Sequence, residues 1–159
     1  MNQVLRYTLQ LVTSLLFVAA VLCSTVPRRT AKAGAPFAVI TVTTTADTVA
    51  ADGFCSLREA IQAANTNAVV NECPAGAAGL DSIEFNLGAG TPVISLSSPL
   101  PSITQAVTID GATGGATRVA LDGVTNGGFG LDLQATSGST IRGLVIRRFL
   151  FGIRIQSGG

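Results

Sequence analysis

Histidine and tryptophan are absent from this 159-residue chain, and cysteine occurs only three times. A zinc site needs four ligands, and the chain has neither a His nor a CxxC pair to complete one. A catalytic thiol is disfavoured on the same ground, because no imidazole is present to activate it. The sequence therefore predicts no catalytic residue, no cofactor site and no zinc ligand set.

Charged residues are also scarce, at 12% of the chain, whereas 47% of the residues are hydrophobic. This composition is typical of a folded domain with a substantial core. Four of the ten basic residues lie within the first 33 positions, which leaves six basic against nine acidic residues afterwards, a net charge of about −3. Because nucleic-acid binding depends on Lys and Arg contacts with phosphates, no nucleic-acid partner is predicted.

Residues 1–33 are predicted to be a signal peptide. Arg6 precedes a mostly apolar run from Leu9 to Cys23, and Ala31 and Ala33 are small residues at the positions that signal peptidase inspects. Such a leader directs export, with cleavage expected after Ala33. An uncleaved membrane anchor is an alternative, although the apolar run is shorter than the ~20 residues that span a bilayer. Lipoprotein processing at Cys23 is disfavoured by the bulky residue before it.

The segment 34–80 is predicted to form a strand followed by a short capping helix. Residues 37–45, FAVITVTTT, are rich in β-branched side chains and predict the strand. Ser56 and Glu59 have the S-x-x-E spacing of a capping box, which predicts a helix that starts at Ser56 and ends at Asn65. The capping role already accounts for Glu59, so a catalytic role is disfavoured.

Two cysteines, Cys55 and Cys73, remain after the leader. In an exported chain an even pair predicts a disulfide. Closing a loop of this size stabilises a fold by ~3 kcal/mol in the chain-entropy model. The disulfide is expected to hold the capping helix in place.

Apolar residues recur at 22-residue intervals in the second half of the chain. The two sets in this register are Phe85, Val107, Phe129 and Phe151, and Leu87, Ile109, Leu131 and Ile153. Period two within strands and a constant separation between them indicate stacked parallel coils. The predicted fold class is all-β, a right-handed parallel β-helix (a solenoid of ~22-residue coils) with a short N-terminal capping helix. Its coils are expected from residue 81 to residue 159, where the sequence ends within a coil, so the chain is expected to be a fragment.

Residues 55–65, CSLREAIQAAN, resemble the CSLREA-type segment at the start of many bacterial surface and secreted proteins. The stretches LDSIEFNL, QAVTIDGAT, VALDG and STIRGLVIRRF resemble the first coils of those proteins, so the resemblance covers residues 37–159. It implies a pectin-lyase-like right-handed β-helix on a large exported protein. The family is defined by architecture and not by a shared reaction, so it implies no catalytic residue.

Three residues are candidates for ligand binding. Asp110, Asp132 and Arg154 are spaced by 22 and are predicted to point outward on adjacent coils. Two adjacent carboxylates could bind Ca²⁺ or raise each other's pKa. The alternatives are solvated surface acids or an ion-pair ladder. A basic cluster, comprising Arg142, Arg147, Arg148 and Arg154, could engage uronic acids or could be the polar outer face of the strands.

Two functions from different classes follow from these observations. The first is an exported cell-surface or secreted scaffold, adhesin-like and non-catalytic in this segment, whose partners would be extracellular glycans or other surface proteins. The second is the N-terminal part of a polysaccharide lyase or glycoside hydrolase with its active site on later coils. If the chain is a scaffold, its N-terminal segment could also template the folding of downstream coils. Membrane contact is expected only through an uncleaved leader or a C-terminal anchor beyond the sequence.

Overall fold

The computed structural model describes residues 37–123, 128–134 and 138–156. The chain divides into two units, Met1–Gly34 and Ala35–Gly159, and every described residue belongs to the second. The predicted signal peptide, residues 1–33, lies outside the described residues.

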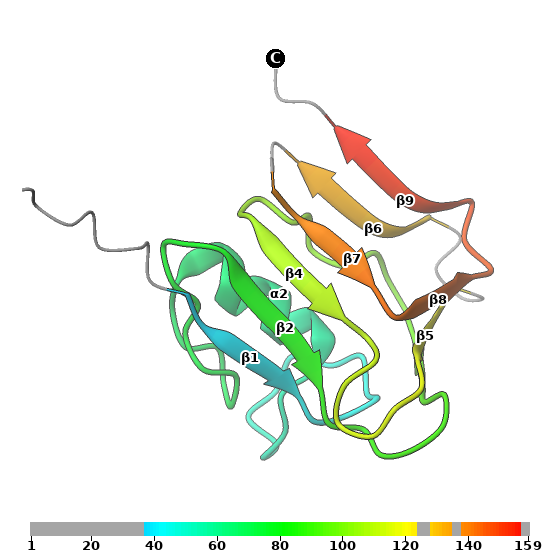
Figure 1. Ribbon diagram of the computed structural model, residues 1–159, viewed down its shortest axis with the longest axis horizontal. Coiled ribbons are helices and arrows are strands. Elements are labelled where there is room, and N and C mark those ends of the chain that lie inside the picture. The colour runs from blue at the N-terminus through cyan, green and yellow to red at the C-terminus, as the bar shows by residue number, and fades with distance from the viewer. Residues whose placement is uncertain (1–36, 124–127, 135–137, 157–159) are drawn as a thin grey trace, which may run out of the picture. The chain divides into compact units, whose positions relative to one another are not determined.

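One helix and nine strands make up the described part of the second unit (Figure 1). In chain order they are β1 (Val39–Val42), α2 (Leu57–Thr66), β2 (Asp81–Phe85), β3 (Val93–Ser95), β4 (Val107–Asp110), β5 (Val119–Asp122), β6 (Phe129–Gln134), β7 (Thr140–Arg142), β8 (Leu144–Arg147) and β9 (Phe151–Gln156). They form three sheets with the strand orders β1-β2-β4-β7, β3-β5-β8 and β6-β9, and all of the pairings between these strands are parallel.

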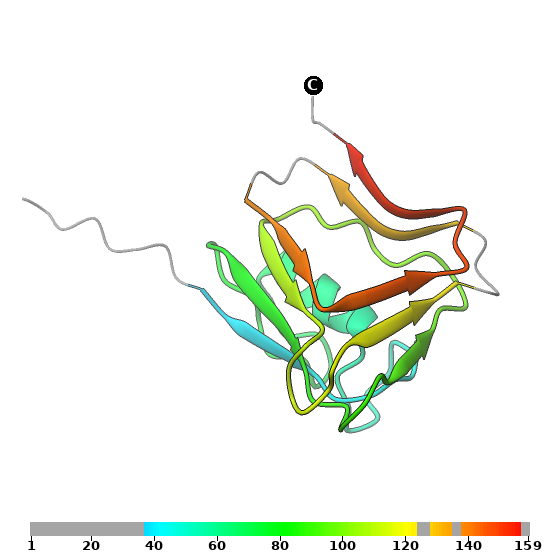
Figure 2. The same cartoon turned by 45° about the vertical axis from the view of Figure 1, so that its right-hand side comes forward.

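Apolar side chains stack in columns across these parallel pairings. In the largest sheet Ile40 pairs with Ile83, Ile83 with Ile109, and Ile109 with Ile141. Alternate residues of β2 and β4 are buried, as expected for strands with one face in the core. Figure 2 shows the three sheets as three sides around a common interior. A single hydrophobic cluster that includes Leu121 and Leu131 from the other two sheets fills this interior.

The predicted right-handed parallel β-helix with 22-residue coils is wrong. The structure instead has three short parallel sheets of four, three and two strands and one helix. The connections between strands differ in length, so residues 22 apart do not generally face each other. Val107 lies opposite Asp81 and not opposite Phe85, which pairs with Val42. Among the strand pairs of the described residues, only β6 and β9 keep the 22-residue register, for example in the pairing of Phe129 with Phe151.

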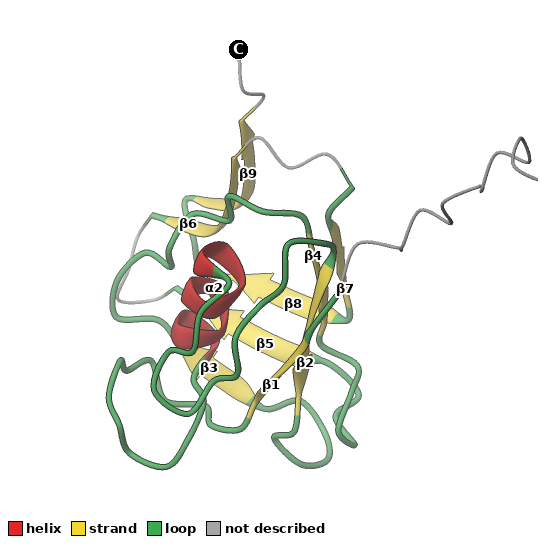
Figure 3. Cartoon of the chain, turned by 90° about the vertical axis from the view of Figure 1, so that its left-hand side faces the viewer, coloured by secondary structure: helices red, strands yellow, loops and turns green. Residues whose placement is uncertain are grey.

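Helix α2 packs against β1 and β2, inside the connection between these two strands (Figures 1 and 3). It begins after Ser56, whose backbone is extended and whose side chain caps the helix. Its apolar side chains Leu57, Ala60 and Ile61 are buried in the core cluster. A helix of ten residues has little stability alone, so this burial and the N-terminal cap account for its formation.

Candidate functional site

The disulfide predicted between Cys55 and Cys73 is present, with 4.9 Å between the two Cα atoms. Both cysteines are buried. Cys55 is also joined to the chain leaving β1, because the Thr43 amide donates to the Cys55 carbonyl at 2.9 Å and the Cys55 amide donates to Thr43 Oγ1 at 2.9 Å. β1 ends at Val42, just before these bonds, whereas the predicted strand extended from residue 37 to residue 45. The start of α2, the end of β1 and the disulfide therefore form one fixed unit.

Ser56 and Glu59 form the predicted capping box: the Glu59 amide donates to Ser56 Oγ at 3.2 Å, and the Ser56 amide donates to Glu59 Oε2 at 2.9 Å. The other carboxylate oxygen of Glu59 accepts hydrogen bonds from the Ala50 amide at 2.9 Å and from Asn71 Nδ2 at 2.6 Å. Burial alone raises the pKa of Glu59, but the hydrogen bonds from Ser56, Asn71 and Ala50 outweigh it, so the pKa lies below its ordinary value. Glu59 thus joins the helix start to the loops on either side of it.

An ion pair between Arg58 and Asp47 joins α2 to the loop before it, and both side chains also bond the loop after β3. The guanidinium and carboxylate lie 2.8 Å apart, and their side chains are only 13% and 5% exposed. Arg58 also donates to the carbonyls of Ser98 and Pro99, while Asp47 accepts from the amide of Ser97 at 2.8 Å. No periodic pattern in the sequence signals the contact with residues 97–99.

Asn65 lies inside the helix and not at its predicted end. The helix ends where Asn67 adopts the left-handed conformation, with φ of 53°. Asn65 instead binds a neighbouring loop, since its Nδ2 donates to the Ser102 carbonyl at 2.7 Å and its Oδ1 accepts from the Thr104 amide at 2.9 Å. Arg58 and Asn65 therefore hold the two ends of α2 against the same connection, between β3 and β4.

Asp132 and Arg154 lie opposite each other on β6 and β9 and form a two-pronged ion pair. Arg154 Nε donates to Asp132 Oδ1 and Nη2 donates to Oδ2, both at 2.8 Å. Ser102 Oγ donates to Oδ2 at 2.7 Å, and the side-chain amides of Gln134 and Gln156 also donate to the carboxylate. The Arg154 guanidinium holds the pKa of Asp132 well below its usual range, although burial opposes this shift. Asp132 is therefore an ionised hydrogen-bond acceptor and not a proton donor near neutral pH.

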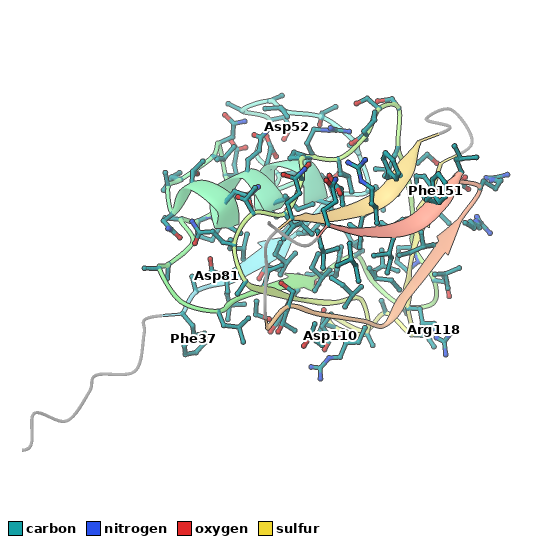
Figure 4. All side chains as sticks on the ribbon, turned by 90° about the horizontal axis from the view of Figure 1, so that it is seen from above. Phe37, Asp52, Asp81, Asp110, Arg118 and Phe151 are labelled. Atoms are coloured by element: carbon teal, nitrogen blue, oxygen red, sulfur yellow. A yellow bond between two sulfur atoms is a disulfide. The ribbon has the colours of Figure 1, made fainter. Side chains whose placement is uncertain are left out.

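Arg154 also lies over an aromatic ring. Its guanidinium carbon is 3.7 Å from the centroid of the Phe129 ring, and the ring of Phe129 stacks on Phe151 with 5.6 Å between centroids. Phe129 and Phe151 are cross-strand partners at the start of β6 and β9, on the side of the domain where Figure 4 labels Phe151.

The predicted adjacency of Asp110 and Asp132 is wrong, because β4 and β6 belong to different sheets. Asp110 pairs with Arg142 on β7, with 2.7 Å between the carboxylate and the guanidinium, and it lies away from Phe151 in Figure 4. The expectation of Ca²⁺ rested on two adjacent carboxylates, which the fold separates. Within the described ranges no three His, Cys, Asp or Glu residues lie close enough to hold a metal ion.

A third pairing joins Asp122 of β5 to two arginines. Its carboxylate is buried and bonds Arg147, which lies opposite it on β8, and Arg148. Arg148 adopts a left-handed backbone conformation, with φ of 61°. All four arginines of the predicted basic cluster therefore pair with an aspartate of an adjacent strand, in the manner of the ion-pair ladder.

The strands β7, β8 and β9 surround a shallow hollow of about 380 Å³. Four apolar side chains, Ile141, Leu144, Ile146 and Ile153, line it together with Gly143, Arg118 and Arg142. The sequence did not predict this feature, because it depends on which strands lie last in each sheet.

Comparison with known proteins gives no match to a family model, to a curated protein or to a solved structure. The described residues contain no helix of the length and apolar character needed to cross a membrane.

Proposed function

We propose that this chain is an exported, non-catalytic scaffold of a bacterial surface or secreted protein, which acts by binding glycans or other surface proteins. The observation that carries the proposal is that four of its carboxylates are already engaged in structural contacts. Asp110, Asp122 and Asp132 are each neutralised by an arginine, and Glu59 is a buried hydrogen-bond acceptor. Acid–base catalysis by a pair of carboxylates needs two that converge on one substrate, whereas these serve the architecture.

Export is supported by the disulfide and by the leader. A buried disulfide persists in oxidising compartments such as the bacterial periplasm and the medium. The resemblance of residues 55–65 to the CSLREA-type segment supports the same location, and we propose that these residues serve as that segment here.

The full chain expressed in a bacterium tests the location. After fractionation, the mass of the intact polypeptide should correspond to a chain that begins at Gly34 and should rise by two hydrogens on reduction. Ala33→Arg should block cleavage and retain the leader, whereas Cys23→Ser should leave the mature mass unchanged. An uncleaved cytoplasmic product with free thiols would contradict export.

The second test asks whether the chain cleaves a polysaccharide. Incubation with polygalacturonate should release no unsaturated or reducing ends above a buffer control. If activity appears and Asp132→Asn removes it while the thermal unfolding curve is kept, Asp132 is catalytic and the scaffold proposal is wrong.

A further inference from the structure

Residues 102–104 extend the sheet of β6 and β9 by one short segment. Ile103 pairs in parallel with Leu133 of β6. Its amide donates to the carbonyl of the residue before Leu133 at 2.7 Å, and its carbonyl accepts from the amide of the residue after Leu133 at 2.8 Å. The Ile103 side chain is only 2% exposed, as expected for a strand residue that faces the core. One edge of the segment is therefore paired with β6, and its other edge faces α2 (Figure 2).

The side chain of Asn65 makes the corresponding contacts at that second edge. Its Nδ2 donates to the carbonyl of Ser102, the residue before Ile103, at 2.7 Å, and its Oδ1 accepts from the amide of Thr104, the residue after, at 2.9 Å. The Asn65 amide thus bonds the residues on either side of Ile103, as the backbone of Ile103 bonds those on either side of Leu133. A side-chain amide carries the same donor and acceptor as a peptide group. Asn65 therefore occupies the place of a strand residue opposite Ile103.

This contact is made by the last turn of α2, which is held by side-chain amides. The start of the helix is held by the capping box, by the disulfide and by Arg58. At the other end, Gln105 Nε2 donates to the Asn65 carbonyl at 2.8 Å, and Asn67 Nδ2 donates to Gln105 Oε1 at 3.3 Å. The last turn of a short helix opens more readily than its packed centre. Opening of that turn would remove Asn65 and uncover the edge of residues 102–104.

An uncovered strand edge is a site for pairing with another strand, and proteins commonly cover such edges with a helix or a loop. A second copy of the chain is the partner that carries the same edge. Two copies related by a two-fold axis would pair residues 102–104 antiparallel, each segment with its counterpart. Charge does not oppose this pairing, because Ser102, Ile103 and Thr104 are all uncharged.

We propose that the Asn65 side chain blocks strand addition at this edge by a second copy of the chain. While its amide bonds Ser102 and Thr104, the edge is occupied. When the last turn of α2 opens, residues 102–104 of two molecules pair. Closure of this edge is independent of export and of glycan binding.

Amide hydrogen exchange and the oligomeric state of the full chain test the proposal. In Asn65→Ala the Thr104 amide should exchange about ten-fold faster, because its acceptor is removed. The same variant should form dimers at about ten-fold lower concentration than the unchanged chain, as measured by sedimentation. Gln62→Ala, in the preceding turn of α2, is the matched control and should change neither quantity.

A second substitution at the edge distinguishes pairing there from association of a loosened fold. Asn65→Ala/Thr104→Lys should return to the oligomeric state of the unchanged chain, because Lys at a strand edge disfavours pairing. Ile109→Val lowers stability through the core of the largest sheet and leaves Asn65 in place, so its oligomeric state should not change.

Unchanged exchange of the Thr104 amide in Asn65→Ala would show that this contact does not protect the edge. Dimers that persist in the double variant, or that form equally in Ile109→Val, would show that association occurs elsewhere or through unfolding. Either result would overturn the proposal.

Discussion

The end of the domain that carries α2 differs from the surface formed by β7, β8 and β9, which we call the edge face, in how its polar groups are used. At the helical end, Arg58 and Asp47 are almost entirely buried and fastened to three loop residues. At the edge face, Arg142 makes an ion pair of similar length but is 65% exposed. The same kind of ion pair is therefore buried at the helical end and exposed to solvent at the edge face.

This difference shows that charge alone does not identify a functional surface in this molecule. Both ends carry Asp–Arg pairs, but the pair at the helical end is buried, whereas Arg142 on β7 is exposed and lines the hollow with Ile141 and Ile153. Matched substitutions at the two ends can break or sharpen this comparison.

The largest expected effect concerns two isoleucines that lie in the apolar columns of different sheets. Ile83→Ala removes a fully buried side chain and should lower the free energy of unfolding by about 4 kcal/mol. Ile153→Ala at the edge face should lower it by less than about 1 kcal/mol, because that side chain is 42% exposed. Denaturant unfolding of both variants measures the difference. Equal losses would mean that the edge face is as well packed as the helical end.

Removal of the disulfide should have the next largest effect. The double variant Cys55→Ala/Cys73→Ala should lose about 3 kcal/mol, because the unfolded chain gains the freedom of the closed loop. Reduction of the unchanged protein should reproduce this loss in thermal unfolding. A loss below about 1 kcal/mol would show that the contacts of α2 hold the helical end without the covalent link.

Glu59→Gln should lower the free energy of unfolding by about 2 kcal/mol near neutral pH. Both carboxylate oxygens of Glu59 accept a hydrogen bond from a backbone amide, and the NH₂ group of Gln would replace one of these acceptors with a donor. Glu84→Gln, on β2, is the matched control and should be near neutral in effect.

The cost of Glu59→Gln should also depend on pH. The folded-state pKa of Glu59 lies below its ordinary value of 4.5, so the carboxylate contributes stability above about that pH, and this contribution is lost as the pH falls through the folded-state pKa. The difference between the two proteins, followed by denaturant unfolding from neutral pH into acid, should therefore shrink. A constant difference would exclude ionisation of Glu59 as its source.

The smallest effects compare the two ion pairs directly. Arg58→Ala should destabilise the domain by about 1 to 2 kcal/mol, because Asp47 would stay buried without its main partner. Arg142→Ala should cost less than about 1 kcal/mol, since an exposed pair is screened by solvent. Thermal unfolding of the two variants in low and high salt tests this order, and a larger loss for Arg142→Ala would reverse the comparison.

Local features of this fold could be predicted from the sequence because they depend on neighbouring residues. The capping box of Ser56 and Glu59 and the pairing of Cys55 with Cys73 are of this kind. The 22-residue register was wrong as a general rule because it assumed a constant separation, whereas Ser82 pairs with Thr108, 26 positions on, and Thr108 pairs with Thr140, 32 positions on.

The candidate site was predicted only in part for the same reason. Arg154 lies opposite Asp132 because the connection between β6 and β9 fits the register, but Asp110 lies in another sheet beside Arg142. The contacts of Arg58 and Asn65 with residues 97–104 join segments about forty positions apart, and no local pattern signals them. The exposed strands of the edge face follow from sheet order, which the sequence does not state.

The position of α2 between the bridged cysteines has a mechanical consequence. The helix spans Leu57–Thr66, and the disulfide joins residues 18 positions apart on either side of it. Tension applied along the backbone would pass through the sulfur–sulfur bond and bypass the helix. A fully stretched chain would be shorter by about 60 Å than one without the bridge. For a protein pulled by flow or by an attached cell, the segment between the cysteines would carry no load until the bond itself was reduced.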